Sequence, residues 1–141
     1  MVAVSFSPGS TSAGDPRAAG TVDYRLARRA VLAEYRKGRL SQSEICDAHP
    51  ELRRAAQLYS HPTAEPCPIC ADHELVLVTY VFGPTLPAFG RCVATLKELS
   101  TLTKSARRHK QPFTCYVVEV CPGCSWNHLA KVFPLAPVRP E

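Results

Sequence analysis

Two cysteine pairs of identical spacing constrain this chain more than any other feature of its sequence. They are Cys67-Pro68-Ile69-Cys70 and Cys121-Pro122-Gly123-Cys124. Each C-x-x-C turn can direct two thiolates toward one point, and four thiolates form a ligand set that tetrahedral Zn²⁺ prefers. The first pair precedes an apolar run and the second lies between two such runs, as in zinc ribbons. We therefore expect one structural zinc ion, bound by Cys67, Cys70, Cys121 and Cys124.

The separation between the two pairs is larger than in a compact ribbon. Fifty residues, 71–120, lie between Cys70 and Cys121, whereas about 15 to 20 are usual. An insertion at residues 83–112 accounts for the excess. The entropic cost of closing a loop grows only logarithmically with its length, so one shared site remains feasible.

Thiol redox chemistry is the main alternative use of a C-x-x-C pair. A reactive thiolate of this kind lies at the start of a helix, but a strand-like run follows Cys70 here. A catalytic zinc ion keeps one coordination position open for water, and four cysteines leave none. We therefore expect a protein that is not an enzyme.

Other cysteines and histidines are weaker candidates for metal ligands. His73 and His128 follow the two pairs closely, and either can replace a cysteine in principle, although four thiolates already complete the coordination. Three further cysteines have no C-x-x-C partner, and we expect them to be small buried apolar residues, with Cys92 the most exposed: Cys46, Cys92 and Cys115.

The N-terminal half has the composition of helices. Residues 22–39 lack proline and are rich in Ala, Leu, Arg and Glu, with Thr21 as the expected N-cap. Ser41 and Glu44 form a capping-box pattern that predicts a short second helix. Pro50 suits the first turn of a third helix, which ends near Tyr59. Residues 1–20 are expected to be a disordered leader, and residues 61–66 a proline-rich linker.

The C-terminal half is expected to contain a small sheet. Residues 74–82, 114–120 and 128–133 have strand composition, residues 95–110 favour a helix within the insertion, and residues 134–141 favour an extended tail. The expected fold class is α+β. In it, an N-terminal segment of about three helices (residues 21–60) is followed by an antiparallel zinc-ribbon sheet (residues 67–133) with a loop and helix insertion (residues 83–112).

Length and composition bound the remaining possibilities. A chain of 141 residues makes one domain or two very small ones. The first residues lack the charged and apolar regions of a signal peptide, and no run of about 18 apolar residues predicts a membrane span. We therefore expect a cytoplasmic protein without a membrane partner.

Arginines give the first expected helix a cationic stripe. At 100° per residue, five of them fall within a sector of about 100°, and two more lie in the third expected helix. Such a surface can bind carboxylates of a protein or phosphates of a nucleic acid, or it can simply be a solvated face. The candidate partner-binding residues are Arg25, Arg28, Arg29, Arg36, Arg39, Arg53 and Arg54.

Three stretches of the chain support a resemblance to a known family. They are residues 45–56 (ICDAHPELRRAA), the Cys67–Cys70 turn with residues 78–83 (VTYVFG), and residues 117–129 (VVEVCPGCSWNHL). Together they resemble a family of small actinobacterial zinc-ribbon proteins known only as a domain of unknown function, over about residues 22–133. The resemblance implies a zinc ribbon in a bacterial cytoplasm and no particular activity.

These observations favour a non-enzymatic accessory protein. By analogy with other small zinc ribbons, we expect it to bind RNA polymerase or a sigma factor and to modulate transcription, with nucleic acid as a further partner within that complex. An RNA- or ribosome-binding protein is the alternative, and a thiol-redox or metal enzyme is the weakest reading. No small-molecule substrate is expected.

Overall fold

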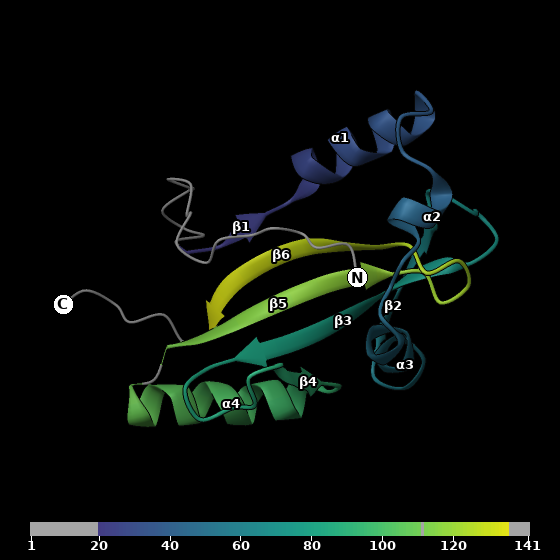
Figure 1. Ribbon diagram of the computed structural model, residues 1–141. Helices are drawn as coiled ribbons and strands as arrows, with labels where there is room; N and C mark the ends of the chain where they lie inside the picture. Colours follow the sequence, from purple (N-terminus) through teal and green to yellow (C-terminus); the bar gives the residue numbers. More distant parts are fainter. Residues whose placement is uncertain (1–19, 111, 136–141) are drawn as a thin grey trace.

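An antiparallel sheet forms the centre of the protein in this computed structural model, which describes residues 20–110 and 112–135 (Figure 1). Its neighbouring strands follow the order β1-β6-β5-β3-β2, and β4 pairs with β3 outside this path. The strands are β1 (Val22–Asp23), β2 (His61–Pro66), β3 (Glu74–Phe82), β4 (Arg91–Val93), β5 (Phe113–Val120) and β6 (Asn127–Leu135). The expected strands therefore exist, and three additional short ones extend the sheet.

Four helices accompany the sheet in the described residues: α1 (Arg25–Arg36), α2 (Gln42–Ile45), α3 (Pro50–Leu58) and α4 (Leu96–His109). The predicted capping box at the start of α2 is confirmed, since the Ser41 side chain accepts from the Glu44 backbone N–H and the Glu44 carboxylate accepts from the Ser41 N–H. Pro50 occupies the first turn of α3, as expected.

The expected order of a helical segment followed by a sheet is wrong. β1 precedes α1 and pairs with β6, while α4 lies between β4 and β5, so helices and strands are interspersed. The protein is α+β, but its sheet draws strands from both halves of the chain. The expected start of the first helix at residue 22, with Thr21 as its N-cap, is also wrong, because Val22 and Asp23 form β1 and Tyr24 is the N-cap of α1. A strand of two residues is too short to show a periodic pattern.

The expected linker at residues 61–66 is also wrong, because these residues form β2. Proline lacks the N–H needed by a central strand and is tolerated at a sheet edge, and β2 is the edge strand beside β3. The expected leader (residues 1–20) lies outside the described residues except for Gly20, and the expected tail (residues 134–141) lies outside them from residue 136.

Side chains of β3 and β5 alternate between the two faces of the sheet, and both faces carry buried residues. Even-numbered residues such as Val78 and Val118 pack in one cluster with Leu52 and Ala55 of α3. Odd-numbered residues of the same strands face the other way, where Val81 packs in a cluster with Leu102 and Ala106 of α4. Thus α3 and α4 cover opposite faces of the sheet.

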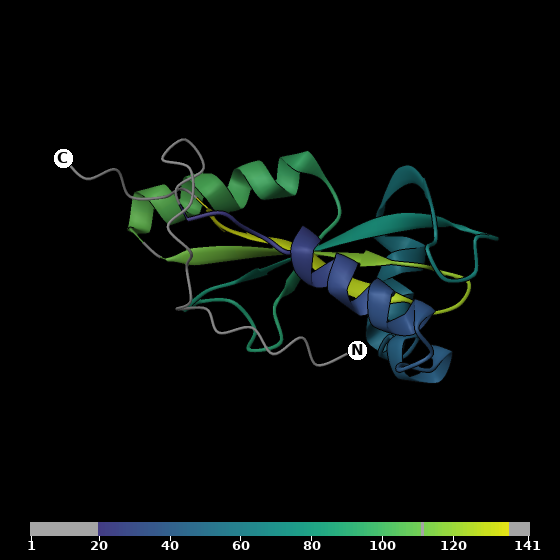
Figure 2. The ribbon, with the colours of Figure 1, turned by 90° about the horizontal axis from the view of Figure 1, so that it is seen from above.

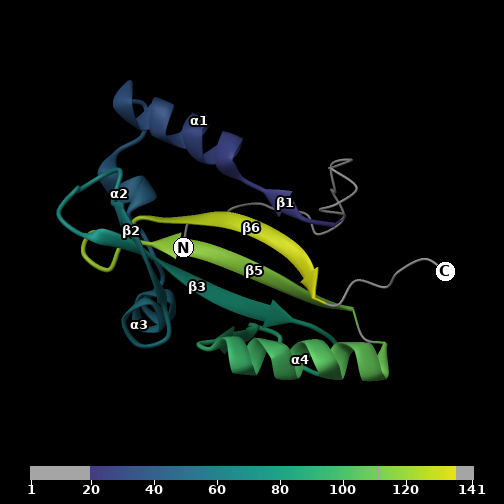
Figure 3. The same ribbon diagram turned by 180° about the vertical axis from the view of Figure 1, so that it is seen from behind.

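Helix α1 lies on the opposite side of the sheet from α3 (Figures 1 and 3). Seen from above, it crosses over β6 near the end of the sheet that carries the cysteine turns (Figure 2). Leu32 is the buried residue of α1 and belongs to a cluster with Leu75 and Trp126. The two cysteine turns meet at this end because β3 begins there and the antiparallel strand β5 ends there.

Candidate metal centre

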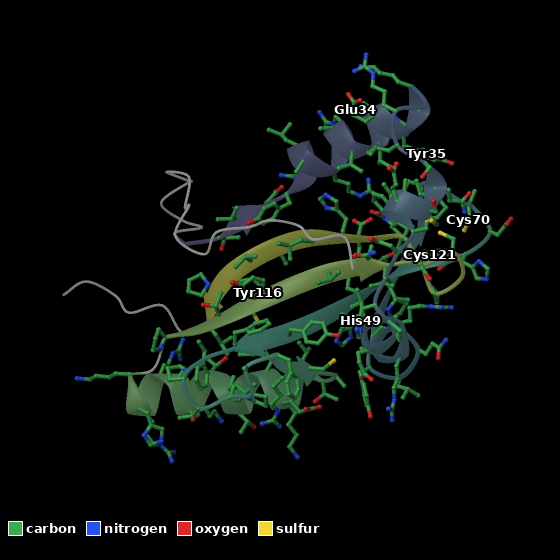
Figure 4. All side chains as sticks on the ribbon, in the orientation of Figure 1. Glu34, Tyr35, His49, Cys70, Tyr116 and Cys121 are labelled. Carbon is green, nitrogen blue, oxygen red and sulfur yellow. The ribbon has the colours of Figure 1, made fainter. Side chains whose placement is uncertain are left out.

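The four predicted cysteines converge at one end of the sheet. Cys67 and Cys70 precede β3, and Cys121 and Cys124 connect β5 to β6. Their sulfur atoms all lie within 4.8 Å of one another, and Figure 4 shows sulfur atoms gathered below α2 near the labelled Cys70 and Cys121. The prediction that two distant pairs share one site is confirmed, and this site can hold one metal ion.

The sulfur–sulfur distances suit a tetrahedral ion. The Sγ atoms of Cys67 and Cys124 are 3.6 Å apart, and those of Cys70 and Cys121 are 3.7 Å apart. Bonds of about 2.3 Å from zinc to sulfur place the ligands of a regular tetrahedron about 3.8 Å from one another. A disulfide requires about 2.05 Å, and all four cysteines are free. The arrangement matches a metal site with closed coordination.

The two turns have the same local structure. In each, the residue four positions after the first cysteine donates its N–H to that cysteine's carbonyl, at 3.1 Å for both Ala71 to Cys67 and Ser125 to Cys121. Both donors adopt positive φ, 58° for Ala71 and 74° for Ser125. The left-handed conformation is costly for residues other than glycine. Its repetition indicates that the same requirement, directing two sulfur atoms to one point, shapes both turns.

Protonation of the thiols differs across the centre. Burial raises the pKa of Cys67 and of Cys124 to about 12. Burial also acts to raise the pKa of Cys70, but hydrogen bonds with His73 and with the Asp72 backbone outweigh it and lower that pKa to about 6. The surroundings therefore favour the thiolate form at Cys70, whereas they favour the protonated thiol at Cys67 and Cys124, from which metal binding must displace a proton.

A fifth cysteine, which sequence reasoning treated as an isolated buried residue, lies beside the centre. Cys46 follows α2, and its Sγ is 3.6 Å from that of Cys124. It is half-buried and does not belong to the four-sulfur group. Cys46 has no C-x-x-C partner, so the sequence contained no signal for this position. The structure places it next to the ligand Cys124.

The segment after α2 is fastened to the second cysteine turn. The Ala48 N–H donates to the Ser125 carbonyl at 3.1 Å, and the Asn127 Nδ2 donates to the Asp47 carboxylate at 3.2 Å. These contacts join residues 46–48 to a turn whose shape depends on its cysteines. A metal ion at the centre would therefore stabilise the position of α2 and α3 as well as the sheet.

A buried carboxylate connects α1 to the same region. Glu119 on β5 is 8% exposed and accepts from the Arg28 Nε, which lies 2.9 Å from both carboxylate oxygens. Glu119 also accepts from the Trp126 indole N–H at 2.8 Å. Trp126 is buried and stacks on His128, with ring centroids 5.9 Å apart. Arg28 therefore stabilises the fold by joining α1 to β5.

The remaining predicted arginines do not form one surface. Arg25 pairs with Asp23, and Arg39 pairs with Glu34. Within the described residues, Arg29, Arg36, Arg53 and Arg54 are exposed and have no ion-pair partner. The first two belong to α1 and the last two to α3, which lies on the other side of the sheet (Figure 3). The structure therefore leaves two separate pairs of exposed cations.

Neither histidine considered as a ligand belongs to the cysteine group. His73 is exposed and lies against the second turn, where a Cβ added at Gly123 would collide with its ring. His128 is buried, and its Nδ1 donates to the Leu129 carbonyl at 2.8 Å. Cys115 is fully buried, as expected, and Cys92 is half-buried.

The model of the family of unknown function DUF5318 matches residues 17–139. The chain belongs to this family. The uncharacterized protein Rv0049 of Mycobacterium tuberculosis (strain ATCC 25618 / H37Rv) is 46% identical to it over 119 residues, which is 84% of each chain. The same figures hold for the uncharacterized protein Mb0050 of Mycobacterium bovis.

The resemblance to an actinobacterial family without known function is therefore confirmed. No solved structure matches this DUF5318 chain. Among the described residues, none of the helices has the length and apolar character required to cross a bilayer.

Proposed function

We propose that this protein is a non-enzymatic accessory protein in which one structural zinc ion positions the N-terminal helices on the sheet. The observation that carries this proposal is the closed group of four sulfur atoms within 4.8 Å. Four thiolates complete a tetrahedral coordination sphere, so no position remains for a substrate or a reactive water molecule. Soft sulfur ligands favour zinc over magnesium or calcium.

The contacts around the centre support a structural role for the ion. Residues 46–48 attach to the second cysteine turn through the Ala48 and Asn127 hydrogen bonds. Because α2 and α3 flank these residues, loss of the turn's shape would release both helices from that end of the sheet. Structural zinc ions contribute folding free energy in this way.

For the partner, we propose RNA polymerase or a sigma subunit in the cytoplasm. Arg29 and Arg36 are seven residues apart on α1 and therefore project from the same side of the helix. Both are exposed and lack an ion-pair partner in the described part of the chain. Such a pair suits carboxylates on a protein surface. The choice of transcription machinery rests on analogy with other zinc ribbons.

Affinity purification of the tagged full-length chain tests this partner. After nuclease treatment, RNA polymerase or sigma subunits should co-purify, and reversing both charges in R29E/R36E should reduce their recovery. R107E/R108E is the matched control, because it reverses two exposed arginines at the end of α4. Absence of these subunits overturns the proposal, as does recovery that disappears with nuclease, which would indicate an RNA-binding protein.

A further inference from the structure

A fifth thiol lies beside the metal centre without belonging to it. The Cys46 Sγ is 3.6 Å from the Cys124 Sγ, whereas the closed group consists of Cys67, Cys70, Cys121 and Cys124. The proposed zinc centre uses four thiolates, so the Cys46 thiol stays uncoordinated. An uncoordinated thiol this close to a ligand sulfur is placed to form a bond with it.

The backbone holds these two sulfur atoms close together. Ala48, two residues after Cys46, donates its N–H to the carbonyl of Ser125, the residue after Cys124, at 3.1 Å. A disulfide needs about 2.05 Å between its sulfur atoms, which is about 1.5 Å less than the distance from Cys46 to Cys124. A small movement of the two side chains therefore brings the sulfur atoms within bonding distance.

Exposure distinguishes this pair from the other two close sulfur pairs. Cys46 and Cys124 are both half-buried. The other pairs, Cys67 with Cys124 at 3.6 Å and Cys70 with Cys121 at 3.7 Å, each contain a buried cysteine. Both members of those pairs are also ligands in the proposed centre, whereas Cys46 is not. A small oxidant from solvent therefore meets the pair of Cys46 and Cys124 most readily.

We propose that Cys46 and Cys124 are the site of a reversible disulfide that hydrogen peroxide forms, with release of the zinc ion. This inference rests on the proposed zinc centre. Because the thiolate is the form of cysteine that binds a metal, a disulfide at Cys124 removes one of the four ligands. The reaction modifies the protein and is not a catalytic activity, so it is compatible with a non-enzymatic role.

The modification removes two electrons from the sulfur pair. The Cys124 thiolate attacks one oxygen of hydrogen peroxide, the O–O bond breaks, and hydroxide leaves Cys124 as a sulfenic acid. The Cys46 sulfur then attacks the Cys124 sulfur, the S–O bond breaks, and the departing hydroxide takes the Cys46 proton to form water. A thiol reductant reverses the disulfide by exchange and restores the Cys124 ligand.

Peptide mapping of the full-length protein tests the site. The reduced, zinc-loaded protein is treated with hydrogen peroxide, its remaining thiols are blocked with N-ethylmaleimide, and it is digested with trypsin. Cys46 then lies in the peptide of residues 40–53, and Cys124 in that of residues 111–131. We expect a disulfide between these two peptides, assigned to Cys124 by fragmentation. A chelating dye should take up one zinc ion per chain, and dithiothreitol should reverse both changes.

Two variants complete the test. Cys46→Ser should bind zinc and release it more slowly under the same peroxide treatment. Cys92→Ser is the matched control, because it changes another half-buried cysteine outside the group of four, and it should behave as the wild type. If Cys46→Ser does not bind zinc, the identity of the disulfide in the wild type decides.

The outcomes separate this inference from the zinc centre. A main product that joins residues 111–131 to residues 55–91, which carry Cys67 and Cys70, would overturn the inference and leave the centre in place. Equal rates of zinc release from Cys46→Ser and the wild type would do the same. Absence of zinc from the reduced wild type would refute the centre itself and the inference with it.

Discussion

Arg28 and Glu119 form an ion pair across 91 positions of the chain, with the Arg28 Nε 2.9 Å from both carboxylate oxygens. The pair links α1 to the central strand β5 beside the metal centre. The Glu119 side chain is 10% exposed and that of Arg28 is 28% exposed, so this contact is shielded from water far more than an ordinary surface ion pair.

Replacing Arg28 with alanine should lower the free energy of unfolding by about 1–3 kcal/mol, because it takes the guanidinium away from a buried carboxylate that then keeps the hydrogen bond from the Trp126 indole. Urea denaturation measures this change. Arg25→Ala is the matched control, since the Arg25 side chain is 83% exposed and surface pairs contribute about 0–1 kcal/mol. Equal effects of the two substitutions would contradict the role assigned to Arg28.

Cys46 should not be a metal ligand, although its sulfur lies 3.6 Å from that of Cys124. Four other cysteines already form the closed group. Cys46→Ser should therefore retain one metal ion per chain, measured by elemental analysis after gel filtration. Loss of the metal from this variant, with the fold preserved by circular dichroism, would show that Cys46 is a ligand and that the assignment of the four is incorrect.

Acid should destabilise the protein partly through His128. Burial lowers the pKa of His128 below its ordinary value of 6.5, so the unfolded state binds more protons once the pH falls to that value. The stability contributed by neutral His128 is present above pH 6.5 and is lost as the pH falls below it. Cysteine protonation also acts at low pH, but equally in a variant that retains the cysteines.

The comparison of wild type with His128→Gln isolates this effect. Thermal unfolding between pH 7.5 and 5 should show a steeper loss of stability in the wild type, because glutamine does not titrate. Parallel pH profiles would mean that His128 is not held neutral in the fold.

Much of the metal centre could be predicted because its signal is local. A C-x-x-C turn specifies two ligands within four residues, and two such turns require only that the chain bring them together. Cys46 could not be found in this way, since its place beside Cys124 depends on how residues 46–48 attach to the Ser125 turn. The same holds for Arg28. Its partner on β5 is distant in sequence, and its position in the arginine stripe of the helix is equally consistent with a solvated side chain.

The fold was predicted less completely, for reasons that differ between elements. The Ser41 and Glu44 capping box and Pro50 mark helix starts through backbone chemistry, and both signals were correct. β2 carries Pro62 and Pro66, which locally indicate a linker, and only its pairing with β3 makes it a strand. β1 is defined entirely by its pairing with β6. Tertiary contacts therefore determine that the residues of β1 and β2 form strands.

The most direct test of this account is the metal content of the purified, folded protein. We predict one zinc ion per chain by elemental analysis, its loss in Cys121→Ser together with loss of the folded structure, and its retention in Cys92→Ser, which changes a cysteine outside the group. A folded wild-type protein without bound metal, or Cys121→Ser that remains folded and keeps its zinc, would contradict the account.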